Sequence, residues 1–374
     1  MLPESIQKQL TIPKELQKNL LPSETFTVNQ LLDFYLPVHR TSTVFTRPDQ
    51  YLSSDPINCS EFNAATILTP PASVIKTLSH AMLTADKTAN IQSIQCPHAL
   101  AHSGKRYPLW LLTFWSELAH VKSIKEHWEK AVQYLTKPDT SLRSSGLPEE
   151  KAKKVCKEIR ALPWNGLIEG FEDQEQLFQL HTYCGRDWLS SVHINHMLDL
   201  LKNDLQITTD ASTSIQNTYH AQQVLAAYHY GNETYLTSKS YHAIRQHAQD
   251  LATGIQDMLG TVANVNGNHW IALMIDFQQS SIYYGDSLGG TINKELQAAY
   301  NWWLLMHNEN AFEWVQMEVT KQQDMYSCGL LAVNALAHAL DPRQFKLMNA
   351  KAVDAERINI LCRIIDRHKK KVSV

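Results

Sequence analysis

Three residues in the C-terminal half of the sequence are of the types that make a nucleophilic triad. Cys328, His269 and Asp286 could serve as nucleophile, general base and orienting carboxylate, in that order. A thiolate attacks a carbonyl carbon, an imidazole moves the proton, and a carboxylate fixes the tautomer and orientation of the imidazole. The side-chain amide of Gln322 could donate to the resulting oxyanion, beside the backbone N–H of Cys328. The chemistry indicated is acyl transfer to a cysteine, followed by hydrolysis.

Two predicted strands and one predicted helix would position these side chains. The apolar run 269–276 follows an Asn-Gly-Asn turn, and the β-prone run 282–285 ends directly before Asp286. A hairpin would bring the outer ends of the two strands together, because the separation of 17 residues from His269 to Asp286 suffices for two strands and a short connection. Residues 330–340 are rich in helix formers, so we expect Cys328 to begin a helix, whose N-terminus lowers the pKa of a thiol.

Each of these residues also has an ordinary structural explanation. A cysteine before an apolar helix is usually a small buried side chain, a His-Trp pair usually packs in a core, and Asp-Ser is common in turns. The order, the spacing and the local sequences of His269, Asp286 and Cys328 together favour the catalytic interpretation.

The local sequences around these residues resemble the ubiquitin-like protease family, the Ulp and sentrin-specific cysteine proteases that process and deconjugate SUMO-type modifiers. In that family a His-Trp begins a strand, an Asp-Ser-Leu follows on the next strand, and a Gln lies six residues before a Cys-Gly. The resemblance covers about residues 170–345. The matching elements, in the same order, are His269-Trp270, Asp286-Ser287-Leu288, Gln322 and Cys328-Gly329.

The resemblance implies roles for further residues. By analogy with the family, Gln322 lines the oxyanion hole, and Gln323, one position nearer the cysteine, is the alternative. Trp188 would cover, together with Trp270, the narrow tunnel that admits the Gly-Gly tail of the modifier. The alternative for Trp188 is packing at the start of the helix that is predicted to continue through Leu201.

The residues and the resemblance together predict an α+β fold. We expect a papain-like cysteine protease domain with a central mixed β-sheet flanked by helices, preceded by a mainly helical region. The predicted domains are residues 1–160, a helical region of unknown role, and residues 161–374, the protease domain. The implied function is a thiol protease that hydrolyses the bond after the C-terminal Gly-Gly of a SUMO-like modifier, by maturation or deconjugation. The expected partners are this modifier and its protein conjugates, and no metal or other cofactor is expected.

Other classes of function stay open from the sequence. The domain could bind a ubiquitin-like protein without cleaving it, or be the protease part of a mobile-element-derived protein with another substrate. A metal hydrolase that uses some of the 17 histidines has little support, because the sequence lacks an HExxH motif or a Cys/His cluster with ligand spacing.

Length and composition restrict the class of protein further. The chain has 374 residues, 44% hydrophobic and 19% charged, which is typical of a globular protein of two domains. The formal net charge of −3 gives no strong field that would favour nucleic acid or an anionic membrane. Six scattered cysteines favour a reducing compartment, and the sequence shows neither a secretory signal nor the roughly 18 apolar residues of a membrane span. We therefore expect an intracellular protein, nuclear or cytoplasmic.

The N-terminal half shows helices without visible chemistry. Apolar positions over residues 109–135 recur at spacings of three and four, which predicts a long helix whose three tryptophans pack in a core. A further helix is predicted over 148–162. The basic stretch 363–371 at the other end of the chain is interpreted as a solvated tail, and a nuclear-import or phosphate-binding signal is the alternative.

Overall fold

The chain divides into two compact units. The computed structural model describes residues 4–37, 50–84, 91–95, 104–137, 139–206, 212–308 and 310–373, so Cys96 lies outside the described residues. The first unit comprises Met1–Lys130 with Ile159–Asn165, and the second comprises Ala131–Glu158 with Gly166–Val374. Residues 131–158 therefore group with the C-terminal half of the chain in this division, while a domain boundary at residue 160 stays a prediction.

The first unit is built mainly from helices around its own core. The long helix predicted over 109–135 is confirmed as α5, in which Trp115 and Trp128 are fully buried and Trp110 is partly buried. Three very short strands form an antiparallel sheet that the sequence analysis did not predict, in the order β1 (Leu52–Ser53), β2 (Ser93–Gln95) and β3 (Arg106–Tyr107). The helices are α1 (Glu4–Leu10), α2 (Lys14–Leu20), α3 (Val28–Asp33), α4 (Ala72–Thr84) and α5 (Trp110–Thr136), of which residues 131–136 are counted in the second unit.

The second unit holds every residue predicted to carry chemistry. A helix predicted over 148–162 is confirmed as α7. Among the described residues, no helix is both long enough and apolar enough to cross a membrane. The α-helices are α6 (Thr140–Ser144), α7 (Glu149–Ala161, of which residues 159–161 are counted in the first unit), α8 (Ser191–Asp204), α9 (Tyr219–Thr237), α10 (His242–Ala252), α11 (Lys294–Leu305), α12 (Cys328–Leu340) and α13 (Val353–Val372).

A five-stranded mixed sheet is the centre of the second unit. Its strands follow chain order, and the central pairs β5–β6 and β6–β7 are antiparallel, whereas the outer pairs β4–β5 and β7–β8 are parallel. The predicted mixed sheet is therefore confirmed, and so is the predicted hairpin, which is β6 with β7. The strands are β4 (Thr213–Ile215), β5 (Met258–Val265), β6 (His269–Asp276), β7 (Ser281–Gly285) and β8 (Glu313–Gln316).

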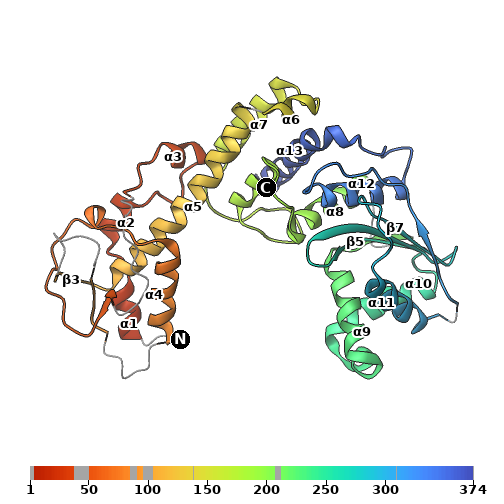
Figure 1. The fold of residues 1–374 in the computed structure, drawn as a ribbon, viewed down its shortest axis with the longest axis horizontal. Coiled ribbons are helices and arrows are strands. Elements are labelled where there is room, and N and C mark those ends of the chain that lie inside the picture. The colour runs from red at the N-terminus through yellow and green to blue at the C-terminus, as the bar shows by residue number, and fades with distance from the viewer. Residues whose placement is uncertain are drawn as a thin grey trace. The chain divides into compact units, whose positions relative to one another are not determined.

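Helices cover both faces of this sheet, as predicted for the α+β fold (Figure 1). On one face, α9, α10 and α11 share a core with alternate residues of β5 and β6, among them Leu259 and Leu273. On the other face, α12 lies close against the sheet, because Gly260 has no side chain where Leu336 of α12 packs. A Cβ atom at Gly260 would lie 2.9 Å from Leu336 Cδ1. The sheet therefore fixes the depth at which α12 lies.

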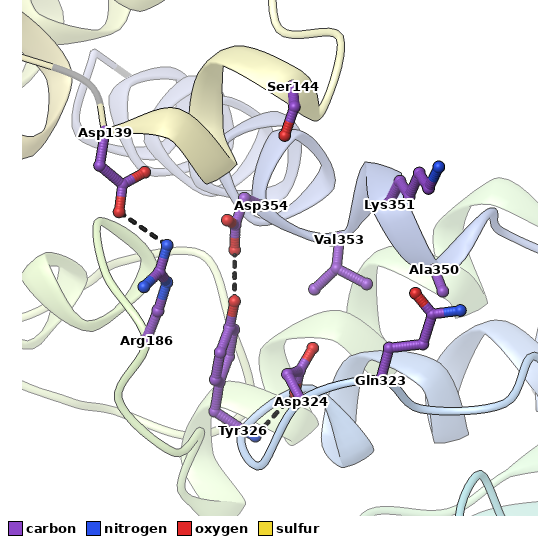
Figure 2. Close-up of a pocket in the computed structure, with 10 residues that line it drawn as sticks. All are labelled: Asp139, Ser144, Arg186, Gln323, Asp324, Tyr326, Ala350, Lys351, Val353 and Asp354. Atoms are coloured by element: carbon purple, nitrogen blue, oxygen red, sulfur yellow. Dashed lines mark hydrogen bonds and ion pairs between the residues drawn. The ribbon is translucent and has the colours of Figure 1, made fainter.

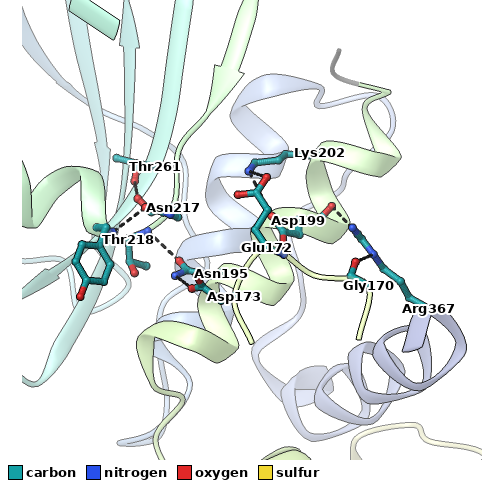
Figure 3. A network of polar contacts seen from close by, with 11 residues as sticks. Gly170, Glu172, Asp173, Asn195, Asp199, Lys202, Asn217, Thr218, Thr261 and Arg367 are labelled. Carbon is teal, nitrogen blue, oxygen red and sulfur yellow. Dashed lines mark hydrogen bonds and ion pairs between the residues drawn. The ribbon is translucent and has the colours of Figure 1, made fainter. Parts of the chain in front are cut away.

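Polar contacts join the segment 170–173 to α8 and α13 (Figure 3). Asn195 of α8 donates to Asp173 Oδ2 at 2.5 Å and accepts from the backbone N–H of Thr218 at 2.8 Å. Arg367 of α13 donates from Nε to the carbonyl of Gly170 at 2.6 Å. Because Thr218 is the residue before α9, Asn195 links α8 to the connection between β4 and α9.

The interpretation of residues 363–371 as a solvated tail is wrong. These residues are the last turns of α13, and several of their basic side chains have partners in the second unit. Nη2 of Arg363 donates to both carboxylate oxygens of Asp204 in α8, at 2.6 and 2.7 Å, and Lys369 pairs with Glu158 of α7. The charges alone did not indicate a packed helix. Its apolar face comes from residues between the charges, such as Ile364 and Ile365, which are buried.

We predict that Leu336→Ala destabilises the second unit by about 2–5 kcal/mol, because it leaves a cavity between α12 and the sheet. Leu336 is fully buried against Gly260. The matched control is Leu305→Ala in α11, where the side chain is 56% exposed and the expected change is within about 0.5 kcal/mol. Urea unfolding of both variants checks this, and equal stabilities would contradict the described packing of α12.

Candidate active site

His269 directly follows the turn between β5 and β6. Asn266 and Gly267 have φ values of 55° and 73°, a left-handed backbone that Asn and Gly adopt readily in tight hairpin turns. The turn pairs Val265, the last residue of β5, with His269, the first residue of β6. The sequence of the turn therefore determines which residue of β6 stands at this end of the sheet.

Asp286 lies beside His269, as the predicted hairpin requires. Asp286 directly follows β7, and its Oδ1 lies 2.8 Å from His269 Nε2. Both side chains are little exposed, at 12% for His269 and 13% for Asp286. The same carboxylate oxygen accepts a hydrogen bond from the backbone N–H of Leu288 at 2.8 Å, which fixes its direction. The carboxylate is thus placed to hold the imidazole in one orientation.

Cys328 completes the triad. It begins α12, as predicted, and is buried, with 5% of its surface exposed. Its side chain is hydrogen-bonded with that of His269. Because Nε2 of His269 faces Asp286, Nδ1 is the ring nitrogen left for Cys328. His269 therefore stands between the sulfur and the carboxylate.

The surroundings of His269 favour its protonated form. The hydrogen bond with Cys328 is the largest influence and raises the pKa of His269 above its ordinary value of 6.5. Burial opposes this by penalising the charged ring, and the hydrogen bond and negative charge of Asp286 raise the pKa again. An imidazolium beside Cys328 stabilises the thiolate, which is the reactive form of a cysteine.

Other described cysteines lie in different surroundings. Burial raises the pKa of Cys184, and it also raises the pKa of Cys362, which is less deeply buried. Both are therefore held as neutral thiols. Burial is the largest influence on the pKa of both thiols. Of these three cysteines, Cys328 is the one placed to react.

Asp324 organises the loop that leads into Cys328. Its Oδ1 accepts from the backbone N–H groups of Tyr326 and Ser327, each at 2.8 Å, and its carboxylate also accepts from the hydroxyl of the fully buried Ser327. These bonds close the turn directly before α12. The sequence analysis missed Asp324, although an Asp three residues before a Ser at a helix start is a recognisable turn signal.

The two candidate glutamines point to different places. Gln322 accepts from the hydroxyl of Ser287 at 3.0 Å, in the turn that carries Asp286. Gln323 is exposed and lines a separate cavity of about 560 Å³, whose walls include Arg186 (Figure 2). Of the two alternatives left open by the sequence, Gln322 is the one joined to the turn of the triad.

Trp188 and Trp270 line one cavity together with Cys328. This cavity has a volume of about 250 Å³. Trp188 is 53% exposed and donates from Nε1 to the carbonyl of Met325 at 2.6 Å, whereas Trp270 is buried and donates to the carbonyl of Leu189 at 3.0 Å. Each indole is therefore fixed by a hydrogen bond at its polar edge, and the exposed face of Trp188 is not accounted for by core packing.

A buried arginine, which the sequence analysis also missed, supports Trp188. Arg357 of α13 is fully buried and donates to the carbonyl of Asp187, the residue before Trp188, at 2.9 Å. Its guanidinium lies 5.5 Å from the ring centroid of Tyr326, a cation–π distance. Tyr326 belongs to the loop before Cys328, so Arg357 connects the two segments that flank the cavity. No local pattern in the sequence marks this residue.

Clustered His, Cys, Asp and Glu side chains would allow metal ligation as an alternative chemistry. Within the described ranges, no group of three or more His, Cys, Asp or Glu side chains is placed to hold a metal ion.

A family model matches the region that holds this site. Residues 187–364 match the Ulp1 protease family, C-terminal catalytic domain. The resemblance to the ubiquitin-like proteases is thereby confirmed, and this part of the chain has the fold of a Ulp1-type cysteine protease domain. The matched range includes His269, Asp286, Gln322 and Cys328. No curated protein is significantly similar to the chain in sequence.

Solved structures of similar proteins include three from different organisms. The Ulp1 protease domain in complex with Smt3, the yeast ortholog of SUMO, has 18% identity and a TM-score of 0.45, over 59% of this chain and 96% of that chain. The catalytic domain of the Ulp1-like SUMO protease of Chaetomium thermophilum has 13% identity and a TM-score of 0.35, over 64% and 89%. The Xanthomonas campestris effector XopD bound to ubiquitin has 17% identity and a TM-score of 0.32, over 47% and 91%.

We predict that Cys328→Ala and Asp286→Asn each lower the pKa of His269, since each removes a group that favours the imidazolium. The folded pKa lies above the unfolded value, so protonated His269 stabilises the fold fully below the unfolded pKa, and this contribution is lost as pH rises through the folded pKa. An NMR titration of the His269 ring protons measures the shift. An unchanged pKa in both variants would contradict the described contacts.

Proposed function

We propose that this protein is a cysteine peptidase that hydrolyses the bond after the C-terminal Gly-Gly of a SUMO-like modifier, by maturation or deconjugation. The observation that carries the proposal is the position of His269, which contacts Asp286 at 2.8 Å and is hydrogen-bonded with Cys328 at the wall of a cavity lined by two tryptophans. The match of residues 187–364 to the Ulp1 protease family supports the same class of reaction.

The reaction is a two-step acyl transfer. The Cys328 thiolate attacks the carbonyl carbon of the terminal glycine, and the oxyanion that forms accepts from the backbone N–H of Cys328 and from the side-chain amide of Gln322. The carbon–nitrogen bond then breaks, and His269 donates its proton to the leaving amine. In the second step neutral His269 takes a proton from water, the hydroxide attacks the thioester carbonyl, and the carbon–sulfur bond breaks to release the Cys328 thiolate beside the imidazolium. Asp286 keeps the imidazole oriented throughout.

The cavity beside Cys328 supports a glycine tail as the substrate. The indoles of Trp188 and Trp270 line it, and each is fixed through its Nε1–H. In the proposed complex an extended glycine segment lies between these two indoles, where a Cβ atom would meet them. The proposed specificity for Gly-Gly therefore follows from the steric walls and not from a charged pocket.

The test of turnover uses the yeast SUMO Smt3 with a fluorogenic coumarin amide on its terminal glycine. We expect the unaltered protein to release the coumarin, and Cys328→Ala to reduce kcat by more than about 10⁴-fold, as loss of a nucleophile does. Cys362→Ala is the matched control and should leave kcat unchanged, because Cys362 lies in α13 outside the site. Activity retained in Cys328→Ala would contradict the proposal, and binding of Smt3 without turnover would favour a non-cleaving module.

A second test addresses the tunnel. We expect an Smt3 substrate that ends in Gly-Ala to be cleaved at least about 10²-fold more slowly than one that ends in Gly-Gly, because the methyl group meets the indoles. Trp188→Ala should narrow this difference, since it removes one wall while Trp270 keeps its contacts to Leu189. Equal rates for the two substrates with the unaltered protein would show that the tryptophans do not select glycine.

A further inference from the structure

We propose that Ser287 is a positioning residue that orients the side-chain amide of Gln322 toward the oxyanion. This inference rests on the proposed function, because an oxyanion forms only if Cys328 acylates. Ser287 follows Asp286 directly and is buried, with 2% of its surface exposed. It has no role in the reaction scheme above, yet it touches the residue that is proposed to stabilise the transition state.

Two hydrogen bonds join Ser287 to Gln322. The Ser287 hydroxyl donates to Oε1 of Gln322 at 3.0 Å, and the Ser287 carbonyl accepts from the backbone N–H of Gln322 at 2.9 Å. The first bond holds the amide group, and the second holds the backbone from which the side chain extends. Loss of the hydroxyl alone would therefore free the amide and leave the chain of Gln322 in place.

The hydrogen bonds of the Gln322 side chain define the positions of its amide nitrogen, Nε2, and its amide oxygen, Oε1. Nε2 lies 2.8 Å from the backbone carbonyl of Asp324, and because a carbonyl only accepts, the nitrogen must lie on that side. Oε1 lies on the opposite side, where Ser287 donates to it. One hydrogen of Nε2 is used by the Asp324 carbonyl, which leaves the second hydrogen as the donor for the oxyanion.

The carboxylate of Asp324 does not compete strongly for that second hydrogen. Its Oδ1 lies 3.5 Å from Gln322 Nε2, a long contact. The same carboxylate accepts shorter bonds from the backbone of Tyr326 and from the backbone and hydroxyl of Ser327, at 2.7–2.8 Å. These bonds also fix the loop that presents the Asp324 carbonyl to Gln322.

A misdirected amide would oppose the reaction. If Oε1 lost its donor and the amide rotated, its oxygen could face the oxyanion, and two partial negative charges repel where a donor is needed. Ser287 prevents this from the same turn that places Asp286 against His269. One turn therefore positions both the carboxylate of the triad and the donor of the oxyanion hole.

The experiment measures kcat and KM with the Smt3 coumarin substrate for Ser287→Ala, Gln322→Ala and the double variant. We expect Ser287→Ala to lower kcat about tenfold with KM unchanged, as loss of one ordinary hydrogen bond would. In the Gln322→Ala background, the same substitution should change kcat by less than about twofold, because there is no amide left to orient. Ser287→Thr, which keeps the hydroxyl, should retain most of kcat. If Ser287→Ala does not fold, Ser287→Cys takes its place, because the thiol is a weak donor of similar shape, and it should show the same loss of kcat.

The matched control is Ser281→Ala. Ser281 lies at the other end of β7, is also buried, and donates to the carbonyl of Gln279 at 3.1 Å without contact to Gln322. It should leave kcat unchanged. A second readout is the rate at which iodoacetamide alkylates Cys328, a reaction that forms no oxyanion. Ser287→Ala should leave this rate unchanged, because the contacts of His269 remain.

Several results would overturn the inference. These are an unchanged kcat in Ser287→Ala, an equal loss in the presence and absence of Gln322, and alkylation of Cys328 slowed in parallel with kcat. If the unaltered protein itself did not release coumarin, the proposed function would fail and the inference with it. A protein that turns over normally but is indifferent to Ser287→Ala would contradict the positioning role alone.

Discussion

The contact between His269 and Asp286 is the interaction on which the rest of the site depends. It joins the first residue of β6 to the residue after β7, and it exists because these strands pair in an antiparallel register with a short connection. A shift of that register by one residue would turn the imidazole and the carboxylate to different faces of the sheet. The tight Asn266-Gly267 turn before β6 fixes the register of β6 against its other neighbour, β5.

The helix α12, which carries Cys328, can approach this hairpin closely because glycines occupy the points of closest contact. Gly329 stands where a Cβ atom would lie 2.5 Å from Ile194 of α8, and Gly285 stands where one would lie 2.8 Å from Met317 and 3.4 Å from Ala335 of α12. Together with Gly260 under the same helix, these positions let α12 lie against the sheet with its first residue at the hairpin mouth. The close packing of α12 therefore places the short side chain of Cys328 beside His269.

Sequence reasoning succeeds where local patterns determine structure. The hairpin, the start of α12 at Cys328 and the long helix α5 follow from alternation, turn residues and helical spacing, and the structure has all three. It fails where the partner is distant in sequence: the bond from Ser287 to Gln322 spans 35 residues, and that from Arg357 to Asp187 spans 170. The basic end of α13 misled because charge was considered without the apolar residues between the charges.

The central claim, that Cys328 is a nucleophile for the C-terminus of a SUMO-like modifier, is tested most directly by covalent capture. The purified protein is incubated with Smt3 whose terminal glycine carries a propargyl amide, and the product is analysed by intact and peptide mass spectrometry. We predict one adduct, on Cys328, that is absent after Cys328→Ala and is much slower to form after His269→Ala. An adduct on another cysteine, or none on folded protein with Smt3 or ubiquitin probes, would contradict the account.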